Sequence, residues 1–136
     1  MNEFFPNLLL GHLVGDYMLQ STMMATTKGQ SHTVQGWFWC SLHCIIYTLC
    51  ICLFLWKLTP LLFVGIFFSH FFIDKFSLAE KWNTLVRGRT FKAAQNETDE
   101  NKKLFTVAFT CLVYVVVDNT MHFLLMWAVL YALNII

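Results

Sequence analysis

The sequence predicts an all-α integral membrane protein: a four-helix bundle whose helices run up, down, up and down through the bilayer. Hydrophobic residues make up 57% of the 136 residues and charged residues only 12%, whereas a soluble domain carries about 25% charged residues. Four apolar stretches approach the length of about 20 residues that a membrane span needs. We therefore expect a single transmembrane domain over residues 1–136.

Each apolar stretch predicts one helix. The four expected helices cover residues 4–24, 36–57, 60–79 and 104–133. Pro60 suits the first turn of the third helix, and the short segment before it makes the second and third helices antiparallel neighbours. The last stretch is long, so its helix is expected to tilt or to protrude from the bilayer.

Two polar connections, residues 25–35 and 80–103, separate the helices and fall on the same side of the membrane. They carry most of the basic residues, whereas the opposite side has only Lys57. Because Lys and Arg are retained on the cytosolic side, we expect both connections, including the polar loop 80–103, in the cytosol and both termini outside. The net charge of +1 gives no support for a nucleic-acid partner. The expected partner is the lipid bilayer.

Three aspartates inside apolar stretches each have a histidine four residues away. The pairs are His12/Asp16, His70/Asp74 and Asp118/His122. Four residues is just over one helical turn, so each pair projects from one face of its helix. Ionisable groups within membrane helices are costly and usually functional. Segments 11–16 and 69–74 also resemble each other, which suggests a duplicated two-helix hairpin.

These pairs, together with His43 on the second helix, can converge on the interior of a bundle. Imidazole and carboxylate groups favour a divalent transition metal, with zinc first and iron or manganese as alternatives. Two such ions would be neutralised by three aspartates and one bridging hydroxide, as a low-dielectric interior requires. The candidate metal ligands are His12, Asp16, His43, His70, Asp74, Asp118 and His122.

Other polar residues lie beside these candidates. Gln20, Tyr47 and Asn119 could orient the ligands from an outer shell or form hydrogen bonds between helices. A metal-held hydroxide would be the nucleophile, and the candidate catalytic residues Asp16 and Asp74 could act as its base. Lys75 is expected to extend to the cytosolic surface.

The motifs resemble a family of small bacterial and phage-encoded integral membrane proteins of unknown function (DUF3307-like). The family pattern His-x3-Asp-x2-Leu-Gln is matched by His12, Asp16, Leu19 and Gln20, the later His-x3-Asp by His70 and Asp74, and Asp-Gln-x2-His by Asp118 and His122. Asn119 replaces the Gln of the last motif. The chain is also distantly similar to membrane-bound metal-dependent hydrolases. This resemblance implies a bacterial inner membrane protein with hydrolase activity.

We therefore expect a membrane-embedded metal-dependent hydrolase that acts on a lipid or a phosphoester near the cytosolic interface. Intramembrane His and Asp residues also build proton relays and ion pathways, and a transporter or channel with four helices would need a homo-oligomer. A non-enzymatic membrane factor that binds a partner protein is a third function class. A purely structural reading, in which the polar residues only join helices by hydrogen bonds, also stays open.

Overall fold

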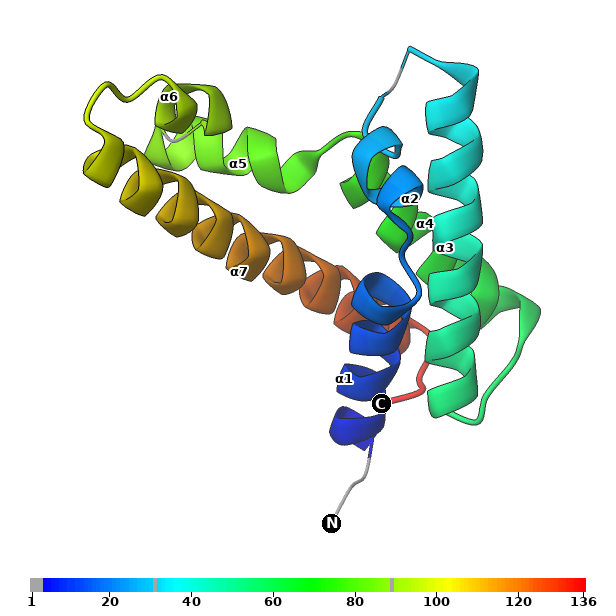
Figure 1. Ribbon diagram of the computed structural model, residues 1–136. Coiled ribbons are helices and arrows are strands. Elements are labelled where there is room, and N and C mark those ends of the chain that lie inside the picture. Colours follow the sequence, from blue (N-terminus) through cyan, green and yellow to red (C-terminus); the bar gives the residue numbers. More distant parts are fainter. Residues whose placement is uncertain (1–3, 31, 89) are drawn as a thin grey trace.

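The computed structural model is all-helical, as predicted, and describes residues 4–30, 32–88 and 90–136, apart from the side chain of Arg87. No strand occurs in these described parts. The elements are α1 (Phe4–Leu13), the π-helix η1 (Val14–Met18), α2 (Thr22–Thr27), α3 (Val34–Phe54), α4 (Pro60–Lys75), α5 (Leu78–Arg87), α6 (Phe91–Gln95) and α7 (Glu100–Ala132). In Figure 1, α1 and α2 lie beside α3, and α7 runs obliquely with α5 and α6 along its N-terminal half.

Short polar side chains mark where most helices begin. Each accepts a hydrogen bond from a backbone N–H of the first turn, which would otherwise lack a partner. These caps are Ser21 for α2, Thr33 for α3, Thr59 for α4, Thr90 for α6 and Asp99 for α7. Pro60 follows its cap in the first turn of α4, where its missing N–H costs nothing. Helices α3, α4 and α7 begin and end within four residues of the expected bounds.

The helix expected over residues 4–24 is not continuous. After α1 the chain widens into the π-helix η1, in which the N–H of Leu19 donates to the carbonyl oxygen of Val14 at 3.0 Å. The helix stops there, and α2 starts only at Thr22. A π-turn inserts one extra residue and is frequent at functional sites. The apolar stretch as a whole predicts one helix, although three polar residues, Gln20, Ser21 and Thr22, stand at this break.

The segment expected as a polar loop over residues 80–103 is mostly helical. It contains most of α5, all of α6 and the start of α7. Ala79 and Asn83 are buried on one face of α5, which packs on α7. The chain bends by 52° between α4 and α5. A charged stretch can thus form a helix when one narrow face of that helix packs against a neighbouring helix.

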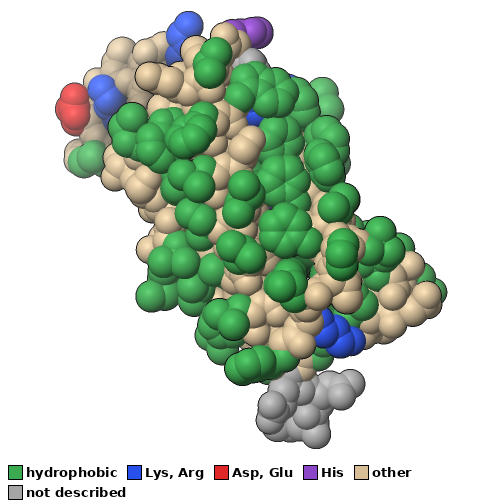
Figure 2. All heavy atoms as spheres, turned by 90° about the vertical axis from the view of Figure 1, so that its right-hand side faces the viewer, with side chains coloured by type: hydrophobic (Ala, Val, Ile, Leu, Met, Phe, Trp, Pro, Cys, Tyr) green, Lys and Arg blue, Asp and Glu red, His purple; other side chains and the backbone are tan. Residues whose placement is uncertain are grey.

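Within the described residues, two helices, α3 and α7, are long and apolar enough to cross a membrane, and the bent pair α4–α5 would make a third span if it crosses as one. α1 is too short to do so alone, with 10 residues. Hydrophobic side chains cover most of the face seen in Figure 2, and charged side chains gather toward its ends. These features are compatible with a membrane protein.

The helices meet in an apolar core at the end of the molecule that holds both termini. The core residues come from α1, α3, α4 and α7: Leu8, Tyr47, Ile51, Cys52, Leu62, Ile66, Met126 and Leu130. Burial of such side chains supplies most of the packing free energy that holds helices together in this region. A cluster of buried His and Asp residues lies next to this core, because Tyr47 belongs to the core and its ring stacks on that of His70.

Candidate metal centre

Six of the seven predicted ligands lie together and are buried between η1, α3, α4 and α7. They form two groups, in each of which one ligand atom per residue lies within 4.8 Å of the others. The first group is Asp16, His43, His70 and Asp74, and the second is Asp16, Asp118 and His122. Asp16 therefore joins the two groups.

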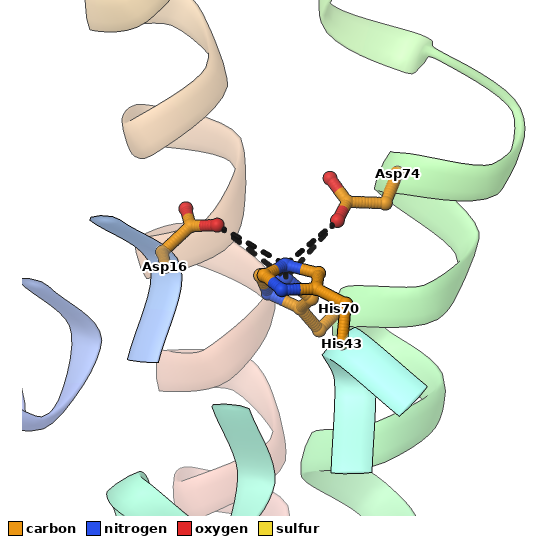
Figure 3. A group of neighbouring side chains, drawn as sticks. All are labelled: Asp16, His43, His70 and Asp74. Carbon is orange, nitrogen blue, oxygen red and sulfur yellow. Dashed lines mark hydrogen bonds and ion pairs between the residues drawn. The ribbon is translucent and has the colours of Figure 1, made fainter. Parts of the chain in front are cut away.

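The first group brings ligand atoms from three elements to one point (Figure 3). Asp16 extends from η1, His43 from α3, and His70 and Asp74 from α4. The Nε2 atoms of His43 and His70 lie 2.9 Å apart. Asp74 Oδ2 lies 3.1 Å from His43 Nε2 and 3.2 Å from His70 Nε2. Asp16 Oδ1 approaches the same two nitrogen atoms at 3.2 and 3.8 Å.

These separations suit one small cation. In a tetrahedral site with bonds of about 2.0–2.1 Å, neighbouring ligand atoms lie roughly 3.3–3.4 Å apart. The distances between ligand atoms given above range from 2.9 to 3.8 Å. Asp74 Oδ2 is buried, and its nearest partners are the ammonium of Lys28 at 2.8 Å and the two imidazoles. The first group therefore fits a divalent metal ion.

Ring stacking orients His70. Its imidazole stacks on the ring of Tyr47 with centroids 3.7 Å apart and on that of His122 with centroids 4.1 Å apart. The Nδ1 atoms of His43 and His70 have no hydrogen-bond partner in the described part of the chain. A metal-binding imidazole is usually oriented by a hydrogen bond from its other nitrogen to a carboxylate. At His70, stacking between the Tyr47 and His122 rings orients the imidazole instead.

The second group is more exposed to solvent than the first, because the side chain of Asp118 is 13% exposed. His122 Nε2 lies 3.7 Å from Asp118 Oδ2 and 3.5 Å from Asp74 Oδ1. This nitrogen is buried and forms no hydrogen bond with the described residues. Asp74 consequently faces the first group with one oxygen and His122 with the other. Asp118 and His122 therefore lie directly beside the first group.

His12 lies outside both groups, unlike the other predicted ligands. Its Nδ1 is 2.9 Å from the hydroxyl of Tyr47, and its Nε2 is 2.7 Å from Oδ1 of Asn119. Asn119 Nδ2 donates in turn to the hydroxyl of Tyr17 and to the carbonyl oxygen of Val115. The predicted outer-shell residues Tyr47 and Asn119 therefore hold His12, whose two ring nitrogens are both engaged.

The side chain of Lys28, which is not among the residues predicted for the site, lies against the carboxylates of the first group. Its Nζ lies 2.8 Å from Asp74 Oδ2 and 3.9 Å from Asp16 Oδ1, and its side chain is only 14% exposed. Burial lowers the pKa of Lys28, but the carboxylates of Asp74 and Asp16 outweigh this effect and raise it above its usual value. The predicted outer-shell residue Gln20, oriented to satisfy both ends of its amide, accepts from Lys28 Nζ at 2.7 Å and donates to the backbone oxygen of Asp16 at 3.2 Å.

Lys75 holds the turn that carries Lys28. Its side chain is fully buried, and not extended to the surface as expected from the sequence. Its Nζ donates to the carbonyl oxygens of Gln30 at 3.1 Å and of Lys28 at 3.5 Å, and lies 4.5 Å from the ring centre of Trp37. A buried ammonium needs such partners. Lys75 therefore ties the turn after α2 to the C-terminal end of α4.

Close packing at Gly15 fixes the position of Asp16. A Cβ at Gly15 would lie 3.0 Å from the Cα of Tyr47, so Gly15→Ala would push η1 away from the backbone of α3. We expect this variant to lose about 1–3 kcal/mol of stability, seen as a lower melting temperature in detergent. Gly65→Ala is the comparison, because its Cβ would lie 2.7 Å from a methyl group of Val129 but would meet side-chain atoms alone and no backbone atom. Equal melting temperatures for the two variants would contradict this account.

The comparisons with known proteins agree with the motif-based resemblance. A family described as "Protein of unknown function (DUF3307)" matches residues 4–135. No curated protein and no solved structure matches the chain. The match covers the π-helix, the cluster of His and Asp residues and all the helices described above. The chain belongs to the DUF3307 family.

Proposed function

We propose that this protein is an integral membrane hydrolase with one divalent metal ion held by Asp16, His43, His70 and Asp74. The observation that carries the proposal is the meeting of two imidazoles and two carboxylates at tetrahedral separations in a buried position. Two nitrogen and two oxygen ligands suit zinc, with iron or manganese as alternatives. For the membrane arrangement we propose the one expected from the sequence, with four helices in the bundle, both termini outside and the polar connections in the cytosol.

Charge balance favours one ion and not the two expected from the sequence. Asp16, Asp74 and Asp118 bring three negative charges, and Lys28 supplies one positive charge beside two of them. Three negative charges and one positive charge leave two negative charges, which one divalent cation neutralises. A low-dielectric interior penalises any larger imbalance. The positive charge of Lys28 thus makes a second metal ion, expected from the sequence, unnecessary for neutrality.

A cavity next to the centre favours hydrolysis over transport. The cavity has a volume of about 320 Å³, and Lys28 and Asp74 form part of its wall. It lies on the polar side of the centre, where the turn after α2 meets the bend between α4 and α5. The apolar core lies on the other side. A channel needs a continuous path across the membrane, whereas this cavity ends at the centre, and a hydrolase needs access from one side alone.

The residues around the ion suit complementary tasks. A bound divalent ion would supply Lewis-acid chemistry and activate water. The ammonium of Lys28 can bind an anionic substrate oxygen as it develops charge. His122 can accept a proton at its unpartnered Nε2, and Asp118 would stabilise the imidazolium that forms. The substrate class that follows is a phosphoester, and the membrane setting points to a lipid.

Metal content of purified variants tests the ligand set. We expect about one divalent ion per chain in the wild-type protein and a loss of metal in His43→Ala, because an imidazole ligand is removed. His12→Ala should keep its metal, since His12 lies outside the group. His32→Ala, in an exposed turn, is the control for handling losses. Elemental analysis in detergent, with phosphate release from phospholipid in mixed micelles, provides the readouts.

Metal retained in His43→Ala but lost in His12→Ala would overturn this ligand set. Metal-loaded protein that releases no phosphate or headgroup from any phospholipid would overturn the hydrolase assignment and leave only the metal centre.

A further inference from the structure

The cavity beside the candidate metal centre changes its charge from the inner end to the mouth. Lys28 and Asp74 line its inner end, with side chains only 14% and 2% exposed. Glu80 lines it as well and is exposed. With a divalent ion on Asp74, the charges of the cluster balance, and the ammonium of Lys28 is the positive group in the cavity wall, whereas the mouth carries the carboxylate of Glu80. A cavity with opposite charges at its two ends suits a ligand with the same separation of charge.

Two aromatic rings in the wall of the same cavity add a second feature. Phe91 of α6 and Tyr114 of α7 both line the cavity, with their ring centroids 5.6 Å apart in an edge-to-face arrangement. Aromatic faces attract ammonium groups, most strongly where water is excluded. A carboxylate together with two aromatic rings is therefore a suitable environment for an organic ammonium ion. Figure 1 shows that α5 and α6, which carry Glu80 and Phe91, lie together on the N-terminal half of α7.

The backbone is strained at the point that places Glu80 over the cavity. Ser77, at the bend between α4 and α5, has a φ of 48°. Left-handed backbone is uncommon for a residue with a side chain and is concentrated at binding and catalytic sites. Asp74, Ser77 and Glu80 all line the cavity at intervals of three residues across this bend. Gly29 completes the wall, because a Cβ there would lie 2.9 Å from Ser77 Oγ.

We propose that this cavity binds a zwitterionic aminoalkyl phosphate, with its phosphate at Lys28 and its ammonium at Glu80, Phe91 and Tyr114. This inference rests on the proposed function, since it names the substrate class of the same centre. A simple anion would find favourable charge at the inner end but repulsion from Glu80. A simple cation would be repelled by Lys28 and the metal ion. Phosphoethanolamine, free or as a lipid headgroup, has both charges in the required order.

The position of the cavity fits a headgroup at the membrane surface. The cavity opens beside α5, whose exposed side chains include Trp82 and Leu85, 48% and 82% exposed. Tryptophan and leucine on a charged helix are typical of elements that lie in the interface between lipid and water. A lipid whose chains lie along α4 and α7 would thus present its phosphate at the depth of Lys28.

The test compares two ligands that differ only in the amine: phosphoethanolamine and ethyl phosphate. Their affinities for the metal-loaded protein in detergent are measured by titration calorimetry, with the metal content determined in the same samples. The wild-type protein should prefer phosphoethanolamine by about tenfold, as expected for one charge-assisted contact. Glu80→Gln should abolish this preference and keep the affinity for ethyl phosphate. Glu100→Gln, an exposed residue outside the cavity at the start of α7, should behave as wild type.

Equal affinities in the wild-type protein, or a preference that survives in Glu80→Gln, would overturn the inference and leave at most a simple anion site. A wild-type protein that binds no metal would overturn the proposed function. The preference for phosphoethanolamine over ethyl phosphate is measured separately by titration, so the two failures can be told apart. Micelles of short-chain phosphatidylethanolamine and phosphatidylglycerol then identify the source of the ligand. Selective binding of the ethanolamine lipid indicates a headgroup site, and binding of free phosphoethanolamine alone indicates a soluble ester.

Discussion

Asp74→Asn is expected to empty the metal centre and to abolish hydrolysis. The substitution keeps the shape of the side chain but removes the charge that faces His43, His70 and Lys28 at 3.1, 3.2 and 2.8 Å. Loss of an outer-shell partner alone weakens metal binding by about 10–100-fold, so loss of this ligand should cost more than about 100-fold. Elemental analysis should find less than stoichiometric metal after dialysis against a buffered metal concentration that saturates the wild type.

The matched control is Asp118→Asn, which makes the same change in the second group. Asp118 is not a member of the first group, so this variant should lose only the effect of one negative charge, about tenfold in metal affinity and far less than Asp74→Asn, while proton transfer through His122 becomes slower. An equal loss of metal in both variants would show that the ion lies between the groups or that two ions are bound, contrary to the assignment of one ion to the first group.

The His/Asp pairs could be recognised from the sequence because their geometry is local. His70 and Asp74 lie one turn apart on the regular helix α4, so their spacing alone predicts that they share a face, and the distance of 3.2 Å between their ligand atoms agrees. Asp118 and His122 do the same on α7. The assumption that polar groups in apolar helices face inward then brings these pairs together without any knowledge of the helix packing.

The parts that could not be predicted depend on tertiary contacts. Lys28 is 46 positions from Asp74, and no helical period relates the two. They come together because the helix breaks after η1 and because Lys75 holds the turn that carries Lys28. His12 shows the reverse case. Its Nε2 lies 3.8 Å from Asp16 Oδ2, so the two side chains share a face as the spacing predicts. Its ring nitrogens lie closer to Asn119 and Tyr47, at 2.7 and 2.9 Å, and these contacts with other helices keep His12 out of the ligand set.

Lys28→Met is expected to have opposite effects on the metal-free and the metal-bound protein. Without metal, the carboxylates of Asp16 and Asp74 would lose their nearest positive charge in a buried position, which costs about 3–5 kcal/mol. With metal, the ion replaces that charge, so most of the stability returns. The cluster also changes from two to three negative charges, which should strengthen metal binding by about tenfold or more. Melting temperatures measured with and without metal should therefore differ more in Lys28→Met than in the wild type.

Lys75→Met separates this charge effect from a simple loss of structure. Lys75 is buried like Lys28, but its Nζ contacts backbone carbonyls and the Trp37 ring and none of the cluster carboxylates. Its removal should lower the melting temperature to a similar extent with and without metal, because the turn is released in both states. Should Lys75→Met gain the same additional stabilisation from metal, displacement of the turn and not charge would explain both variants. Weaker metal binding in Lys28→Met would show instead that the ammonium positions the carboxylates for the ion, because a purely electrostatic competitor can only strengthen metal binding when it is removed.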